Sequence, residues 1–152
     1  MSVQLLIAYD PGKLTGCASC VFDTDTKEVS AFAGVQADPT SVLDGLWQLV
    51  QVVPTHLRIC VGYERFTITQ ATTKLSRQYD ALDFIGALKW ITHHCTIDVD
   101  PPRDPAAAKG TVSNDKLRRL EFWTPSSEHA NDAARHLVLM LLHRGWYSTV
   151  FD

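Results

Sequence analysis

Short apolar runs alternate along this chain with longer segments in which apolar residues recur at helical spacing. The runs at 3–9 and 57–63 are almost wholly apolar, which is typical of strands buried on both faces of a sheet. Between them, 16–23 and 28–35 are separated by a short polar turn, so they predict an antiparallel hairpin. Residues 95–99, which precede two prolines, predict one more strand.

Helical periodicity predicts helices between and after these strands. We expect the last helix to begin near Thr124, as the N-cap before Pro125, and to stop at Gly145. The order of elements predicts an α/β fold with a mixed five-stranded β-sheet flanked by α-helices, in a single domain spanning 1–152. The expected helices cover 39–53, 72–94, 105–109, 114–120 and 124–143, the third and fourth being joined at Gly110.

Composition narrows the class of protein. The chain has 152 residues, no apolar stretch long enough to span a bilayer and no basic start typical of a secretory signal, so we expect a cytoplasmic protein. The net charge of −3 means that any nucleic-acid binding must use a local basic surface. We expect the cysteines to be free thiols, because two cysteines three apart on a strand face opposite sides and no second C-x-x-C follows. They are Cys17, Cys20, Cys60 and Cys95.

Four polar residues lie where a mixed sheet places catalytic groups. Asp10 follows the first apolar run, and Glu64 follows the run at 57–63. His129 and Asp132 lie three apart near the start of the last helix, so they share one helix face. Sites in such sheets form at the carboxyl ends of strands, and carboxylates from separate elements suit hard divalent cations. The pattern therefore favours a metal-dependent hydrolase.

The segment Asp10-Pro11-Gly12 also fits a simple β-turn that begins with an aspartate. In the functional interpretation, Gly12 and Gly16 let the backbone turn tightly and approach a phosphate. Phosphate-binding loops of ATP-binding actin-like proteins are similar to this segment.

Three residues have simpler interpretations beside a functional one. Glu64, which would be costly to bury unpaired, could form a salt bridge with Arg65 instead of binding a cation. His136 and His143 continue the helix face of His129, and we interpret them as a solvated polar stripe.

Taken together, the motifs resemble the RuvC family of Holliday-junction resolvases, within the ribonuclease H-like superfamily. The matching segments are Ile7–Gly12 with Thr15-Gly16, Val61–Glu64 and His129–Ala133, and their order agrees along nearly the whole chain. The small size and divergent middle are similar to phage-encoded members. The resemblance implies a ribonuclease H-like fold and a nuclease of DNA recombination, repair or phage DNA processing, located in the host cytoplasm if phage-encoded.

The resemblance also implies an active site at Asp10, Glu64, His129 and Asp132, with His129 at a position where some members carry aspartate. We expect two Mg²⁺ ions, for which Mn²⁺ would substitute, with Asp10 bridging them. The expected partner is branched DNA, a four-way junction cut on two strands by a homodimer with the helix 72–94 at its interface.

Residues for DNA contact are predicted from the resemblance and from local charge. The resemblance matches Lys109 to a basic residue before the last motif, and Phe66 to an aromatic that follows the glutamate. Basic side chains of the segment 101–119 and at the start of the helix expected at 72–94 could neutralise further phosphates. These are Lys74, Arg77, Lys116, Arg118 and Arg119.

Three alternatives stay open on sequence alone. A flap or branched-DNA endonuclease would use identical ligands. An actin-like ATP-binding protein would explain the first motif but neither Glu64 nor the pair His129 and Asp132, and the chain is short for two lobes. A DNA-binding module without catalytic activity is the third.

Overall fold

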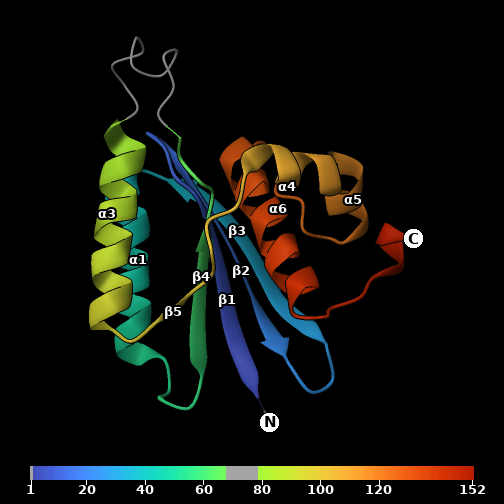
Figure 1. The fold of residues 1–152 in the computed structure, drawn as a ribbon, viewed down its shortest axis with the longest axis horizontal. Coiled ribbons are helices and arrows are strands. Elements are labelled where there is room, and N and C mark those ends of the chain that lie inside the picture. Colours follow the sequence, from blue (N-terminus) through green and yellow to red (C-terminus); the bar gives the residue numbers. More distant parts are fainter. Residues whose placement is uncertain (1, 68–78) are drawn as a thin grey trace.

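A central sheet with helices on both faces forms this protein (Figure 1). The structure is a computed structural model and describes residues 2–67 and 79–152. Its strands are β1 (Val3–Asp10), β2 (Thr15–Asp23), β3 (Val29–Ala37), β4 (Arg58–Tyr63) and β5 (Asp98–Val99). In the described residues the sheet has the order β3-β2-β1-β4-β5. The β1–β2 and β2–β3 pairs are antiparallel, whereas β4 runs parallel to both β1 and β5.

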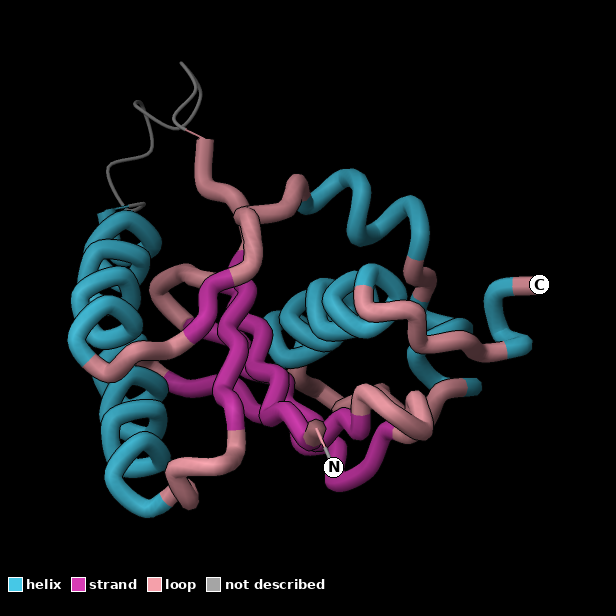
Figure 2. Tube along the Cα trace, turned by 60° about the horizontal axis from the view of Figure 1, so that its bottom comes forward, coloured by secondary structure: helices cyan, strands magenta, loops and turns pink. Residues whose placement is uncertain are grey.

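The helices divide between the two faces of the sheet (Figure 2). On one face lie α1 (Pro39–Val52) and α3 (Tyr79–His94). On the other lie α4 (Pro105–Thr111), α5 (Asn114–Arg119) and α6 (Glu128–His143), followed by the 3₁₀ turn η1 (Thr149–Phe151). This architecture confirms the predicted mixed α/β fold class. No described helix combines the length and apolar character that crossing a membrane requires.

Strand β1 is apolar on both sides because it lies between two cores. Leu6 and Ala8 pack in the core under α6, whereas Ile7 and Tyr9 pack in the core under α1 and α3. In α3, Phe84 contacts Tyr9 edge-on, with 5.3 Å between ring centroids, and is buried. Because successive side chains of a strand point to opposite faces, a strand between two cores needs a continuous apolar run.

The predicted free cysteines are confirmed. The four thiols form no disulfide, and Cys20 lies in the core under α6. Cys17 packs on the opposite side of β2, against the core under α1 and α3. The pair therefore cannot bind one metal ion from adjacent positions.

Several predicted boundaries were wrong, for local backbone reasons. Strand β5 has two residues rather than the span 95–99, because Thr96 adopts a left-handed φ of 54° in the turn after α3. Gly110 lies inside α4, and α5 starts afresh from the N-cap Ser113. The first part of the helix predicted at 72–94 lies outside the described residues, which resume at the start of α3.

Helix α6 begins at Glu128 rather than near Thr124, with Ser127 in the N-cap position. The backbone of Thr124 instead exchanges two hydrogen bonds with the Asn131 side chain. Its N–H donates to Oδ1 at 2.8 Å, and its carbonyl accepts from Nδ2 at 2.9 Å. These bonds hold the preceding loop against the first turn of α6. The helix ends at His143, and Gly145 follows with φ of 78°, as predicted.

Two glycines let α6 lie close against the sheet. A Cβ on Gly16 in β2 would lie 1.8 Å from the carbonyl oxygen of His129. A Cβ on Gly62 in β4 would lie 2.6 Å from the sulfur of Met140. The first contact is backbone against backbone, so it sets how near the start of α6 can approach the strands.

A buried ionic network fixes the far end of α6. The Arg144 guanidinium donates to both carboxylate oxygens of Asp100, at 2.6 and 2.9 Å, and to the Cys60 sulfur at 2.7 Å. Burial opposes ionisation of Asp100, but hydrogen bonds from Arg144, Cys60 and Arg103 outweigh it and hold the pKa of Asp100 well below its usual range. Helix α6 is therefore attached to the sheet at both ends.

Candidate active site

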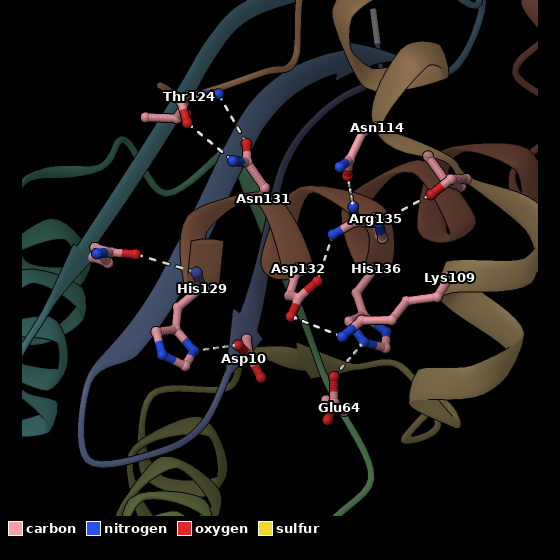
Figure 3. A network of polar contacts seen from close by, with 12 residues as sticks. Asp10, Glu64, Lys109, Asn114, Thr124, His129, Asn131, Asp132, Arg135 and His136 are labelled. Atoms are coloured by element: carbon pink, nitrogen blue, oxygen red, sulfur yellow. Dashed lines mark hydrogen bonds and ion pairs between the residues drawn. The ribbon is translucent and has the colours of Figure 1, made fainter. Parts of the chain in front are cut away.

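The structure brings Asp10, Glu64, His129 and Asp132 to one edge of the sheet, where β1 and β4 end and α6 begins (Figure 3). Tyr9 and Tyr63 are partners in the parallel register of these strands, so the two acidic residues that follow are neighbours. The Glu64 N–H donates to the carbonyl of Tyr9 at 3.0 Å. The arrangement that the strand order predicted is therefore present.

His129 reaches Asp10 because of the glycine opposite it. Asp10 pairs with Gly16 across β1 and β2, and the backbone of His129 lies directly on Gly16. The imidazole Nδ1 is 2.9 Å from Oδ2 of Asp10, and the His129 N–H donates to Gln36 Oε1 at 3.1 Å. The expectation that Gly16 admits a phosphate was wrong, since the start of α6 occupies that space.

Glu64 pairs with His136, a histidine that the sequence predicted to be solvated. Its Oε2 lies 3.0 Å from Nε2 of His136, whose side chain is only 2% exposed. The interpretation of His136 as part of a solvated stripe was therefore wrong, while His143 is exposed as expected. Arg65 donates to the carbonyl of Pro102 at 3.4 Å, so the proposed alternative partner of Glu64 is engaged elsewhere.

Two cationic side chains face Asp132. The Arg135 guanidinium donates to Oδ1, and the Lys109 ammonium lies 3.2 Å from Oδ2. Arg135 is 8% exposed and is held in place by the carbonyl of Val112, at 3.0 Å, and by the side chain of Asn114. Sequence reasoning missed Arg135, although its position three residues after Asp132 on a helix places it on the same face.

The surroundings of Asp10 oppose the ionisation of its carboxyl group. Burial is the main cause that raises the pKa of Asp10, and the nearby charges of Glu64 and Asp132 add to it, whereas the hydrogen bond from His129 lowers it; together they bring the pKa to about 6. Glu64 and Asp132 are thus close enough to repel Asp10. A bound cation would reduce that repulsion.

No three histidine, cysteine, aspartate or glutamate side chains of 2–67 and 79–152 are grouped closely enough to hold a metal ion. Each carboxylate instead faces a basic partner, as described above. The chemistry of the donor set nevertheless fits a hard divalent cation, because Asp10, Glu64 and Asp132 supply oxygens from three elements and the charges of Glu64 and Asp132 repel that of Asp10.

The predicted DNA-contact residues lie in different surroundings. Lys109 is next to the site, with its side chain 57% exposed beside Asp132. Phe66 is partly buried against the core under α1 and α3. Lys74 and Arg77 lie outside the described residues.

The remaining basic residues lie on α5. The Arg118 guanidinium is 4.3 Å from the ring centroid of Trp123, and Arg119 is exposed. Lys116 donates to the carbonyl of Thr111 at 2.9 Å. Lys109 on α4 and these three residues on α5 thus belong to two helices that pack against α6.

Comparison with known proteins identifies a solved structure with a similar fold. The sequence matches no protein-family model and no curated protein. The structure of T. thermophilus RuvC in complex with a Holliday junction substrate is similar, with 15% identity, a TM-score of 0.57 and coverage of 93% of this chain and 96% of that chain. The chain therefore shares the ribonuclease H-like fold of RuvC, as the sequence resemblance implied.

Two further structures are more distant. The Fowlpox virus resolvase with its substrate Holliday junction DNA has 15% identity and a TM-score of 0.49, covering 91% of this chain and 95% of that chain. A Ppx/GppA family member from Aquifex aeolicus has 8% identity and a TM-score of 0.37, covering 81% of this chain and 41% of that chain.

We predict that Gly16→Ala destabilises the protein, because the new methyl would overlap the backbone of His129. The expected loss in the free energy of unfolding is about 3 kcal/mol or more, at the upper end for overpacking. Gly45→Ala is the matched control, since Gly45 lies in α1 with nothing within 4 Å of its Cβ position. That variant should gain about 0.5–1 kcal/mol. Urea unfolding measures both, and equal stability of the two variants would contradict the close approach.

We also predict that Asp10→Asn stabilises the metal-free protein at neutral pH. The pKa of Asp10 is about 6 when folded and near its ordinary 3.8 when unfolded, so the folded state binds a proton more tightly and wild-type stability falls as pH rises from about 4 to 6. Removing the charge should recover on the order of 2–3 kcal/mol at pH 7.5 in EDTA.

This gain should disappear below about pH 4, where the carboxyl is protonated in both states. Urea unfolding across pH measures it. Asp98→Asn is the control, because Asp98 forms an exposed ion pair with Arg58 and should change stability by less than about 1 kcal/mol. A gain for Asp10→Asn that is independent of pH would contradict the electrostatic origin.

Proposed function

We propose that this chain is a divalent-cation-dependent endonuclease that resolves four-way DNA junctions, as RuvC-type resolvases do. The observation that carries the proposal is the meeting of Asp10, Glu64 and Asp132 with His129 at one sheet edge. The fold is that of T. thermophilus RuvC, whose structure contains a Holliday junction substrate. Carboxylates on two adjacent strand ends and a helix suit hydrolysis of a phosphodiester.

In this proposal Asp10, Glu64 and Asp132 would hold the cations, with His129 beside them. Bound divalent cations would supply charge neutralisation at the phosphate and a water of lowered pKa. An ionised Asp10 only accepts hydrogen bonds, so Nδ1 of His129 carries the proton in their contact. The other ring nitrogen, Nε2, takes no part in that contact. His129 can therefore hold a water molecule or a ligand at Nε2 while Asp10 fixes its ring.

The basic residues of α4 and α5 would bind the DNA backbone despite the net charge of −3. Lys109 lies beside Asp132, and Arg118 and Arg119 on α5 are exposed. Such side chains bind phosphates without reading base sequence, so recognition would depend on the shape of the junction.

We predict that Asp10→Asn and Asp132→Asn each lower cleavage of a four-way junction by at least about 100-fold in Mg²⁺, because changes even beside metal ligands cost 10–100-fold. EDTA should abolish wild-type cleavage, and Mn²⁺ should restore it. Asp44→Asn, an exposed change on α1 at the opposite face of the sheet, should cleave as the wild type does.

The substrate is tested in the same assay with flap, fork and four-way DNA at equal concentration. Preference for the four-way junction supports resolution, whereas preference for flaps would reassign the chain to branched-DNA cleavage with the same residues. Full cleavage by either carboxylate variant would contradict the site.

Paired cutting of a two-fold junction requires two active sites, so we propose a homodimer. Trp90 on α3 is 56% exposed and Trp47 on α1 is 44% exposed, which leaves aromatic surface on that side of the molecule. We expect sedimentation at micromolar concentration to give twice the mass of one chain. A monomer that still cuts both strands in one binding event would contradict the paired-site model.

A further inference from the structure

His136 is buried at a position where an apolar residue would be expected. Its neighbours toward the sheet on α6, Ala133, Leu137 and Met140, are apolar and fully buried. His136 is 2% exposed, and its Nδ1 has no hydrogen-bond partner among the described residues. An unpaired buried nitrogen lowers stability, so packing alone does not account for a histidine here.

The contact with Glu64 determines where the proton of His136 lies. A carboxylate accepts hydrogen bonds and cannot donate, so Nε2, 3.0 Å from Oε2 of Glu64, carries the proton. The arrangement therefore makes the Nε2–H of His136 a donor to Glu64, while Nδ1 faces no partner among the described residues.

The Glu64 side chain needs such a partner. Its backbone is fixed at the end of β4 by the hydrogen bond to Tyr9, but the carboxylate extends on a flexible stem and is 23% exposed. Within the described part of the chain, His136 is the side chain that bonds this carboxylate (Figure 3). The bond holds Oε2 and leaves Oε1 without a described partner.

We propose that His136 is a positioning residue, whose Nε2–H holds the Glu64 carboxylate in the orientation needed to receive a divalent cation. The inference rests on the proposed function in that Glu64 serves as a cation ligand. Side chains that orient metal ligands by hydrogen bonds typically change affinity or activity 10–100-fold when removed. His136 acts through Glu64 and does not touch the substrate itself.

Two polar variants separate positioning from packing. The amide nitrogen of glutamine lies about where Nε2 of histidine lies, so His136→Gln keeps the donor to Glu64. The amide of asparagine is shorter and lies near the position of Nδ1, so His136→Asn loses it. His143→Leu is the control, because His143 is exposed on the same helix. Circular dichroism checks that every variant is folded.

The first readout is Mn²⁺ binding without DNA, by electron paramagnetic resonance of free Mn²⁺. We expect His136→Asn to weaken Mn²⁺ affinity about tenfold or more, and His136→Gln and His143→Leu to stay within about threefold of wild type. Unchanged affinity in His136→Asn, or equal losses in the asparagine and glutamine variants, would overturn the proposal.

The second readout is cleavage of the four-way junction. We expect His136→Asn to lower kcat about tenfold or more with KM within about twofold. In a Glu64→Gln background, His136→Asn should cause no further loss, and an additional tenfold loss there would overturn action through Glu64.

The two proposals fail in distinguishable ways. A wild type whose Mn²⁺ affinity depends on His136, but which cuts no branched DNA, supports the positioning role and contradicts the junction nuclease. A wild type that cuts junctions while His136→Asn matches it in Mn²⁺ affinity and kcat supports the nuclease and contradicts the positioning role.

Discussion

The contact of α6 with Gly16 is the constraint on which the candidate site depends. Hydrogen bonding between β1 and β2 places Gly16 opposite Asp10, and the missing side chain lets the backbone of His129 lie on the strand. Any side chain at Gly16 would displace the first turn of α6 and move both His129 and Asp132 away from the strand ends. The geometry of the site therefore depends on this backbone packing as well as on its polar contacts.

The polar contacts then give each carboxylate of the site a partner. Each carboxylate has one basic neighbour or more: Asp10 has His129, Glu64 has His136, and Asp132 has Lys109 and Arg135. Even with these neighbours, burial and the nearby charges of Glu64 and Asp132 hold the pKa of Asp10 near 6.

Much of this could be predicted from local pattern. The continuous apolar run of β1 and the strand-end positions of Asp10 and Glu64 are one-dimensional signals, because strand polarity alone brings such ends together. The start of α6 was misplaced because Thr124 and Pro125 form a good capping sequence. The side chain of Asn131 instead bonds the backbone of Thr124 and keeps it in the loop, a contact that cap statistics do not contain.

The roles of Gly16 and His136 could not be predicted, for the same physical reason. A glycine after a strand-end turn suggests local flexibility, and a histidine on the polar side of a helix suggests exposure; both inferences use only near neighbours in sequence. Each role depends on a segment roughly 70 or more residues away, namely α6 for Gly16 and the end of β4 for His136. Residues that shape this site without forming it are therefore identifiable only once α6 is placed against the sheet.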